Sequence, residues 1–150
     1  MSNSFFSKIE EPRIVESIRA AELRSRGEIR IHITEVAVDD PVKEATAAFE
    51  RLGMTATQER NGILIFIAPT SHKFAVMGDS GITSRVGTAP LDEMASTIQA
   101  AFREGRFTDG LVAAIAQAGD LLATHFPRVL DAHGKDAPDK DELSNTISRG

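Results

Sequence analysis

The sequence predicts an α/β fold in which a mixed sheet lies between layers of helices. Segments with helical spacing of apolar residues alternate along the chain with short strand-like segments. One of these, residues 63–68, is apolar at every position, which is typical of a strand buried on both faces. With 150 residues, of which 41% are hydrophobic, the chain is long enough to form one domain with its own core.

The first half of the chain predicts a helix, a strand and a second helix. Apolar residues with helical spacing run from Glu11 to Arg26, and Gly27 is typical of the position just after a helix. In residues 28–35 apolar and polar side chains alternate, which predicts a strand with one covered face. Helical spacing then returns over residues 42–53.

The second half predicts two strands followed by two helices. Residues 69–72 are short enough to reverse the chain between the strand at 63–68 and a strand at 73–77, so these two strands are expected to be antiparallel. The two earlier strands are joined through a helix and are expected to be parallel. Helical spacing follows over residues 90–102 and 111–125.

The end of the chain differs from the rest in composition. Residues 131–150 contain five acids, three bases and few apolar side chains. This composition predicts a mobile polar tail, so that residues 1–130 form the single domain.

Composition also narrows the classes of function. The chain has no cysteine, which excludes thiolate catalysis, redox motifs and cysteine-based zinc sites. Its 17 Lys and Arg against 22 Asp and Glu give a net charge of −5, which argues against a nucleic-acid partner. Neither a signal peptide nor a long apolar run is present, so we expect a cytoplasmic protein without membrane insertion. Phosphate-binding glycine loops are absent, so no nucleotide cofactor is expected.

Short motifs in the sequence do not assign a catalytic residue. Residues 78–81, Gly-Asp-Ser-Gly, match the tetrapeptide around a serine protease nucleophile, but the chain lacks the two β-barrels such enzymes need. A glycine turn after a strand is the simpler interpretation. His32, His72 and His125 show no spacing that would bring catalytic partners to them.

Asp79 is the candidate metal ligand. The predicted sheet places Glu35, Asp39 and Asp40 at the same edge as residues 70–72, and Asp79 at the opposite edge near Glu28 and residues 60–62. A carboxylate between glycines, together with backbone carbonyls, offers the oxygen ligands that Ca²⁺ prefers. Alternatively, Asp79 caps its own backbone in an Asx turn.

Several segments together resemble the TPM domain family over roughly residues 9–127. The resemblance lies in residues 21–33, 49–57, 60–68, 74–82, 102–111 and 125–127. It implies a three-layer α/β/α sandwich whose central layer is a mixed sheet of about four strands. Thylakoid members are associated with acid phosphatase activity and calcium binding, so the resemblance implies Ca²⁺ or Mg²⁺ at Asp79, which lies in the family-like Gly78-Asp79-x-Gly81 element. Unlike members with a signal peptide and membrane anchor, this chain is expected to be a stand-alone cytosolic version.

Three functions follow as hypotheses, of which the third is a structural partner that binds through the acidic tail at residues 131–150. The first is a non-catalytic module that binds a protein partner or a divalent cation, because no nucleophile and base converge in the sequence. The second is a metal-assisted phosphatase, in which a cation on Asp79 assists phosphomonoester hydrolysis. The sequence specifies neither the partner nor an oligomeric state.

Overall fold

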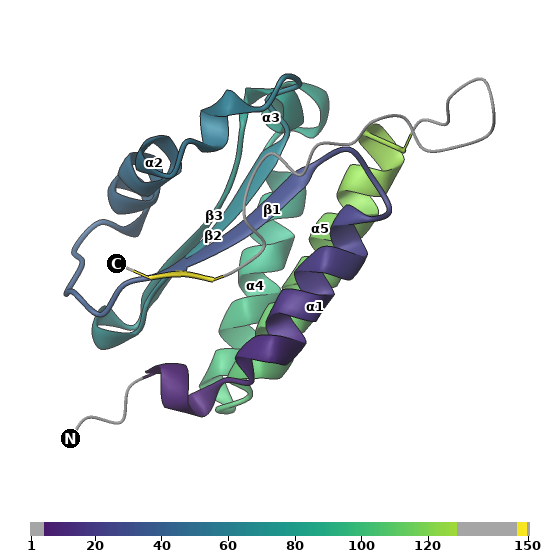
Figure 1. Cartoon of the computed structure of the whole chain (residues 1–150). Coiled ribbons are helices and arrows are strands. Elements are labelled where there is room, and N and C mark those ends of the chain that lie inside the picture. Colours follow the sequence, from purple (N-terminus) through teal and green to yellow (C-terminus); the bar gives the residue numbers. More distant parts are fainter. Residues whose placement is uncertain (1–4, 129–146, 150) are drawn as a thin grey trace.

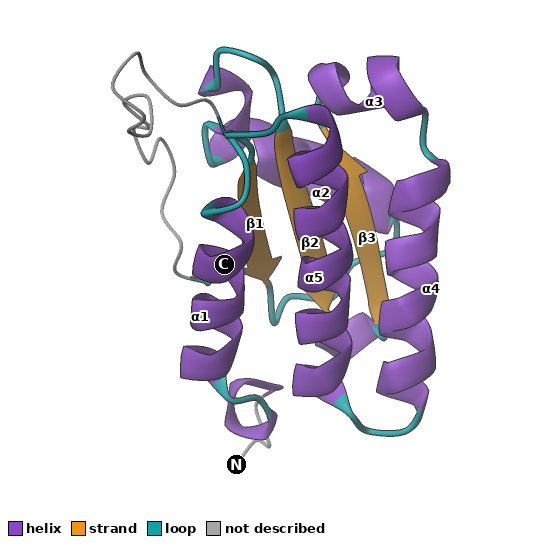
Figure 2. Cartoon of the chain, turned by 90° about the vertical axis from the view of Figure 1, so that its right-hand side faces the viewer, coloured by secondary structure: helices purple, strands orange, loops and turns teal. Residues whose placement is uncertain are grey.

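The protein is an α/β/α sandwich, as the sequence predicts (Figure 1). The computed structural model describes residues 5–128 and 147–149. One face of the sheet is covered by α1 (Glu11–Glu22), α4 (Ala89–Arg103) and α5 (Phe107–His125), which lie side by side with α5 in the middle (Figure 2). The other face is covered by α2 (Pro41–Arg51).

The sheet is mixed and has four strands in the order β3-β2-β1-β4. The strands are β1 (Glu28–Ile33), β2 (Gly62–Ala68), β3 (Lys73–Gly78) and β4 (Ser148–Arg149). The parallel pairing of β1 with β2 and the antiparallel pairing of β2 with β3 confirm the predicted directions. β4 is parallel to β1 and pairs with His32 and Ile33.

The two sheet faces build two hydrophobic clusters. Ile29, Ile31 and Ile33 of β1 point into the larger cluster beneath α1, α4 and α5. Leu64 and Phe66 of β2 belong to the smaller cluster beneath α2. Every residue of β2 is buried, so the continuous apolar run in the sequence correctly indicated the strand that is covered on both faces.

Four details differ from the sequence-based expectation, and the first is that α1 ends at Glu22 rather than at Arg26 before Gly27. A short helix, α3 (Ser80–Val86), begins where a turn was predicted to close β3, because Asp79 caps a helix rather than an isolated turn. α5 begins at Phe107, four residues before the predicted start. Residues 147–149, within the predicted polar tail, include the strand β4 and the buried Ile147, whereas residues 131–146 and 150 lie outside the described residues.

Short 3-10 helices occupy the connections that shape the ends of the sheet. They are η1 (Phe5–Lys8), η2 (Met54–Ala56) and η3 (Pro69–Ser71). η3 reverses the chain between β2 and β3, and His72 follows it in a left-handed conformation with φ 54°. None of the helices in the described ranges combines the length and apolar character needed to cross a membrane.

Candidate functional site

Asp79 lies in a tight polar cluster at the end of β3. Its side chain is almost completely buried and caps α3, with Oδ1 accepting a hydrogen bond from the Ser80 N–H at 2.7 Å. Arg60 donates twice to the same carboxylate, from Nε to Oδ2 at 2.7 Å and from Nη2 to Oδ1 at 2.9 Å. The hydrogen bond to Asp79 and the charge of this carboxylate raise the pKa of Arg60 above its ordinary value.

The backbone around Asp79 holds this pair in place. The Asp79 N–H donates to the Gly62 carbonyl at 2.9 Å, and the Gly81 N–H donates to the Arg60 carbonyl at 2.8 Å. A Cβ on Gly81 would lie only 2.0 Å from the Glu59 carbonyl oxygen, so no side chain fits there without backbone movement. Arg60 itself adopts a left-handed backbone conformation with φ 50°. The glycine and the strained arginine together bring the guanidinium onto Asp79.

The structure thus places Asp79 beside residues 60–62, at the end where β1 begins, as the sequence predicted. Asp79 does accept a hydrogen bond from the backbone N–H that follows it, but as the cap of α3 and not in the predicted Asx turn. To bind a cation, Asp79 would first have to release the guanidinium of Arg60, because this group is positively charged like the metal and occupies the same carboxylate. Among residues 5–128 and 147–149, no group of three or more His, Asp or Glu could hold a metal ion. A Ca²⁺ or Mg²⁺ site at Asp79 therefore stays a prediction, and the donors around it in this part of the chain do not favour it.

The opposite end of the sheet brings together the polar residues that the sequence placed there. The Thr70 hydroxyl donates to the Glu35 carbonyl at 2.9 Å, and the Ser71 hydroxyl accepts from the Val38 N–H at 2.6 Å. Lys73 donates to the Asp39 carbonyl at 2.5 Å. These contacts fix the loop after β1 against η3, at the carboxyl ends of β1 and β2.

A groove of about 710 Å³ opens at this same end, between η1, η3, β3 and the adjoining ends of α4 and α5. We call it the carboxyl-edge groove. Its apolar wall consists of Phe5, Ile67, Phe74, Phe102 and Phe107. Phe102 is in the middle of the aromatic rings, with ring centroids 5.8, 6.1 and 5.1 Å from those of Phe5, Phe74 and Phe107. Such edge-on and tilted arrangements leave ring faces and edges that can receive a further apolar group.

Three cations border the carboxyl-edge groove. They are Lys8 at the end of η1, Lys73 at the start of β3 and Arg103 at the end of α4, accompanied by one acid, Glu35. The Lys8 ammonium lies 6.0 Å from the centre of the Phe107 ring. No ion pair to any of these three cations occurs within residues 5–128 and 147–149.

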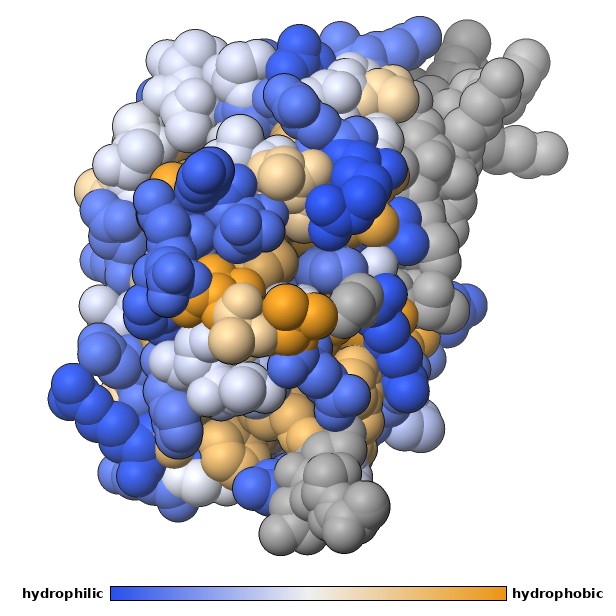
Figure 3. Space-filling view, turned by 90° about the vertical axis from the view of Figure 1, so that its left-hand side faces the viewer, coloured by the Kyte–Doolittle hydropathy of each residue, from blue (hydrophilic) through white to orange (hydrophobic). Residues whose placement is uncertain are grey.

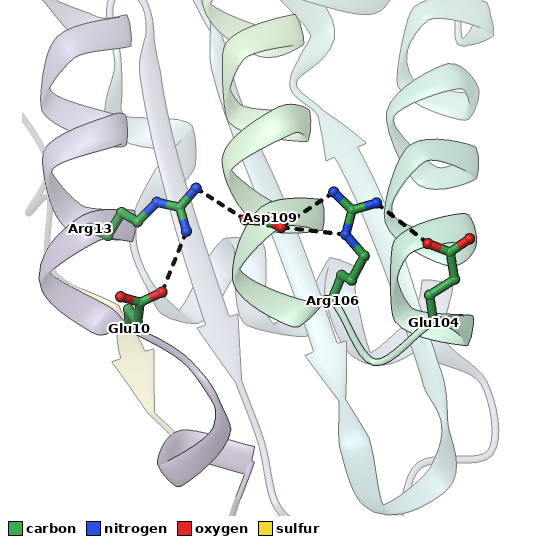
Figure 4. A network of polar contacts seen from close by, with 5 residues as sticks. All are labelled: Glu10, Arg13, Glu104, Arg106 and Asp109. Atoms are coloured by element: carbon green, nitrogen blue, oxygen red, sulfur yellow. Dashed lines mark hydrogen bonds and ion pairs between the residues drawn. The ribbon is translucent and has the colours of Figure 1, made fainter.

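A surface network of ion pairs holds the neighbouring helix ends together (Figure 4). Asp109 at the start of α5 contacts Arg13 of α1 at 3.0 Å and Arg106 of the α4–α5 connection at 3.3 Å. Hydrogen bonds from Arg13 and then Arg106 lower the pKa of Asp109. Next to this network, the Glu10 N–H donates to the Thr108 hydroxyl at 3.0 Å. The segment after η1 is thereby attached to α5, which keeps Phe5 against Phe107.

The histidines occupy three different surroundings. His32 is buried beneath α2, stacks on Phe66 with ring centroids 5.7 Å apart, and its Nδ1 lies 2.9 Å from the Ser148 hydroxyl. Burial, followed by the charges of Arg51 and Arg30, lowers the pKa of His32. His72 is exposed at the carboxyl-edge groove, and His125 ends α5.

Sequence reasoning placed the loops of the carboxyl edge correctly but did not identify the groove. Its four phenylalanines stand at positions 5, 74, 102 and 107, with no common spacing, and the three cations are equally scattered. Only the topology brings them together. The one signal in the sequence was a phenylalanine on each side of the turn at Gly105, Phe102 and Phe107. This pattern indicates aromatic residues where two helices meet but not what they face.

Comparisons with known proteins identify the family. Residues 2–121 match the family model described as TPM domain. The NMR structure of the BA42 protein from the psychrophilic bacterium Bizionia argentinensis is 38% identical, with a TM-score of 0.80 over 93% of this chain and 92% of that chain. The chain therefore belongs to the TPM domain family, which confirms the resemblance seen in the sequence.

A more distant structure shares the fold. The NMR structure of the N-terminal domain of the cg2496 protein from Corynebacterium glutamicum is 16% identical, with a TM-score of 0.55 over 89% of this chain and 82% of that chain. No curated protein has a significantly similar sequence. The family and the fold are thus established, and the function has to be argued from the chemistry of the molecule itself.

Proposed function

We propose that this TPM domain is a non-catalytic module that binds a segment of a protein partner in the carboxyl-edge groove. The observation that carries the proposal is the groove itself, about 710 Å³ in volume, with an aromatic wall and a cationic border. In open α/β sheets, ligands bind in the crevice outside the carboxyl ends of the strands. The volume also lies within the roughly 300–1,000 Å³ that is typical of ligand sites.

The surface around the groove supports a protein partner rather than a small enclosed ligand. Val36 follows Glu35 of the groove and is 66% exposed, and Val42 at the start of α2 is 59% exposed. The view onto the α2 side of the molecule shows apolar side chains gathered in the middle of this face and surrounded by hydrophilic ones (Figure 3). Val36 adjoins the groove through Glu35 and extends the apolar area that a protein partner would cover, whereas Val42 belongs to the face of the sheet that α2 covers.

The state of Asp79 supports a non-catalytic role. Its carboxylate accepts three hydrogen bonds, two from Arg60 and one from Ser80. A carboxylate that is held in this way serves the local fold, because both of its oxygens already accept hydrogen bonds from Arg60 or Ser80. The same contacts give the Gly-Asp-Ser-Gly motif a structural role, since Asp79 caps α3 and Ser80 begins this helix.

The test of this proposal blocks the groove without altering the core. Gln99 is exposed and lines the groove, and Glu93 is exposed on the same helix α4 but does not line it. Gln99→Trp should fill the groove, and Glu93→Trp is the matched control. We expect a partner retained from lysate by the wild type and Glu93→Trp, and identified by mass spectrometry, to be lost with Gln99→Trp.

Two results would contradict the proposal. Retention of the same partner by Gln99→Trp would place the interaction elsewhere. Hydrolysis of p-nitrophenyl phosphate with Ca²⁺ or Mg²⁺ by the wild type, lost in a folded Asp79→Asn variant, would replace the binding module by the metal-assisted phosphatase. Circular dichroism of each variant confirms that it is folded.

A further inference from the structure

The three cations at the carboxyl-edge groove differ from most other arginines and lysines of the molecule. Arg13, Arg19, Arg24, Arg26, Arg60, Arg106 and Arg149 each form an ion pair with a carboxylate. Lys8, Lys73 and Arg103 form none within the described ranges, although the chain as a whole has an excess of acids. Arg30, Lys43, Arg51 and Arg85 also lack an ion pair within these ranges, but none of these four lines the groove, where three such cations meet.

The fold brings these three cations from distant parts of the sequence to the same groove. They come from η1, β3 and α4, with 65 positions between Lys8 and Lys73 and 30 between Lys73 and Arg103, and they meet at the groove. Arg103 also suits the C-terminal end of its helix, where the helix dipole favours a cation. The dipole explains one cation of the three, however. Within the described part of the chain, the hydrogen-bond acceptor of Lys73 is a backbone carbonyl, that of Asp39.

Between the cations lies the aromatic wall. Phe74, Phe102 and Phe107 are only partly buried, although each lies against another ring. A large apolar side chain of a partner could cover the parts of these rings that face the groove and remove them from water. The groove thus offers an apolar contact in its middle and positive charge at its border, and Glu35 is the one acid among the described residues that line it.

From this arrangement we infer that the groove selects an acidic peptide segment with one or two large apolar residues at its centre and Asp or Glu on both sides. This inference rests on the proposed function, and it adds the chemistry of the partner. Acids on the segment would meet Lys8, Lys73 and Arg103, while the apolar residues would contact the phenylalanines. A basic segment would place its charges against these cations and be rejected.

The experiment uses three fluorescein-labelled hexapeptides and the full chain, with binding measured by fluorescence anisotropy. The peptides are Asp-Glu-Leu-Phe-Glu-Asp, the same peptide with Lys at its four acidic positions, and the acidic peptide with Ala-Ala in place of Leu-Phe. We expect saturable binding of the first peptide alone, and weaker binding as salt is added.

Charge reversals on the protein locate the interaction. Arg103 and Arg19 both lie in the last turn of a helix, but only Arg103 lines the groove. Arg103→Glu should weaken binding of the acidic peptide about fivefold or more, because an attraction becomes a repulsion. Arg19→Glu changes the charge and the helix dipole in the same way and should leave the affinity unchanged.

The outcomes separate this inference from the proposed function. Equal binding of the acidic and basic peptides, with both blocked by Gln99→Trp, would overturn the charge selection and leave the groove as the binding surface. Binding that neither Arg103→Glu nor Gln99→Trp reduces would overturn both. Binding to phosphatidylglycerol vesicles without binding to any peptide would overturn the inference that an acidic peptide is the ligand. The three cations would then be assigned to a lipid surface.

Discussion

The substitution Gly81→Ala tests the close backbone approach that fixes Asp79. A Cβ at this position would lie 2.0 Å from the Glu59 carbonyl oxygen and 2.6 Å from the Arg60 carbonyl oxygen. Ordinary contact begins at 3.4 Å, so the backbone of one segment has to move by 3.4 − 2.0 = 1.4 Å. Such a movement breaks the hydrogen bond from the Gly81 N–H to the Arg60 carbonyl and separates Arg60 from Asp79.

The expected cost follows from these two effects. Overpacking costs about 1–3 kcal/mol, and the upper end applies here because both neighbours are backbone atoms. The lost hydrogen bond adds about 1 kcal/mol. Gly81→Ala should therefore lower the free energy of unfolding by about 4 kcal/mol. Gly105→Ala is the matched control, since its φ of +74° is strained for alanine but no atom lies within 4 Å of its Cβ. That strain costs about 1–2 kcal/mol.

The assay is urea unfolding followed by far-ultraviolet circular dichroism, because the chain has neither Trp nor Tyr for fluorescence. The free energies of unfolding of the wild type and the two variants are compared at pH 7. If Gly81→Ala is no less stable than Gly105→Ala, residues 59–60 do not approach Gly81 as described, and the reasoning about Asp79 fails with it.

Three further predictions concern stability. In urea unfolding, Asp79→Ala should have a free energy of unfolding about 1 kcal/mol lower than Asp79→Ser, because serine still caps α3 while both variants lose the pair with Arg60. Equal free energies of unfolding would show that the cap contributes nothing. The lowered pKa of Asp109 stabilises the fold above its unfolded pKa, and this contribution is lost as the pH falls through the lower folded value. The difference in stability between wild type and Asp109→Asn should therefore shrink from pH 7 to about pH 3, and a constant difference would refute the assignment. The pKa of His32 is lower in the folded protein than in the unfolded chain, so below about pH 6.5 the unfolded chain binds a proton before the folded protein does. Stability should therefore fall as the pH decreases from there to the lower folded pKa. Thermal unfolding of His32→Gln should lack this part of the pH dependence, and an unchanged profile would contradict it.

The order and direction of the main strands were predictable because they depend on local patterns. The alternation in β1 and the continuous apolar run of β2 follow directly from which faces are buried. The turn at residues 69–72 is too short for anything but an antiparallel return. Together these features place Asp79 at one end of the sheet and residues 70–72 at the other.

The features that were missed depend on contacts between distant parts of the chain. β4 has two residues, and its pairing with His32 and Ile33 leaves no periodic signal. α3 has seven residues, too few for a recognisable apolar stripe, and it forms because Asp79 caps it and Ile82 is buried. The groove needs Phe5 and Phe102 to meet across almost a hundred positions. The approach of residues 60–62 to Asp79 was predicted, but the left-handed backbone of Arg60 was not.

The central claim is that this TPM domain binds its partner in the carboxyl-edge groove and uses Asp79 to hold its own fold. Amide NMR of the ¹⁵N-labelled chain tests it most directly, with the acidic peptide added first and CaCl₂ added to a second sample. The account predicts saturable shifts at residues 69–74 and 99–107 with the peptide, and no saturable shift centred on residues 78–82 with calcium. Saturable calcium shifts at residues 78–82, with no peptide shifts at the groove, would contradict the account and return Asp79 to the centre of the function.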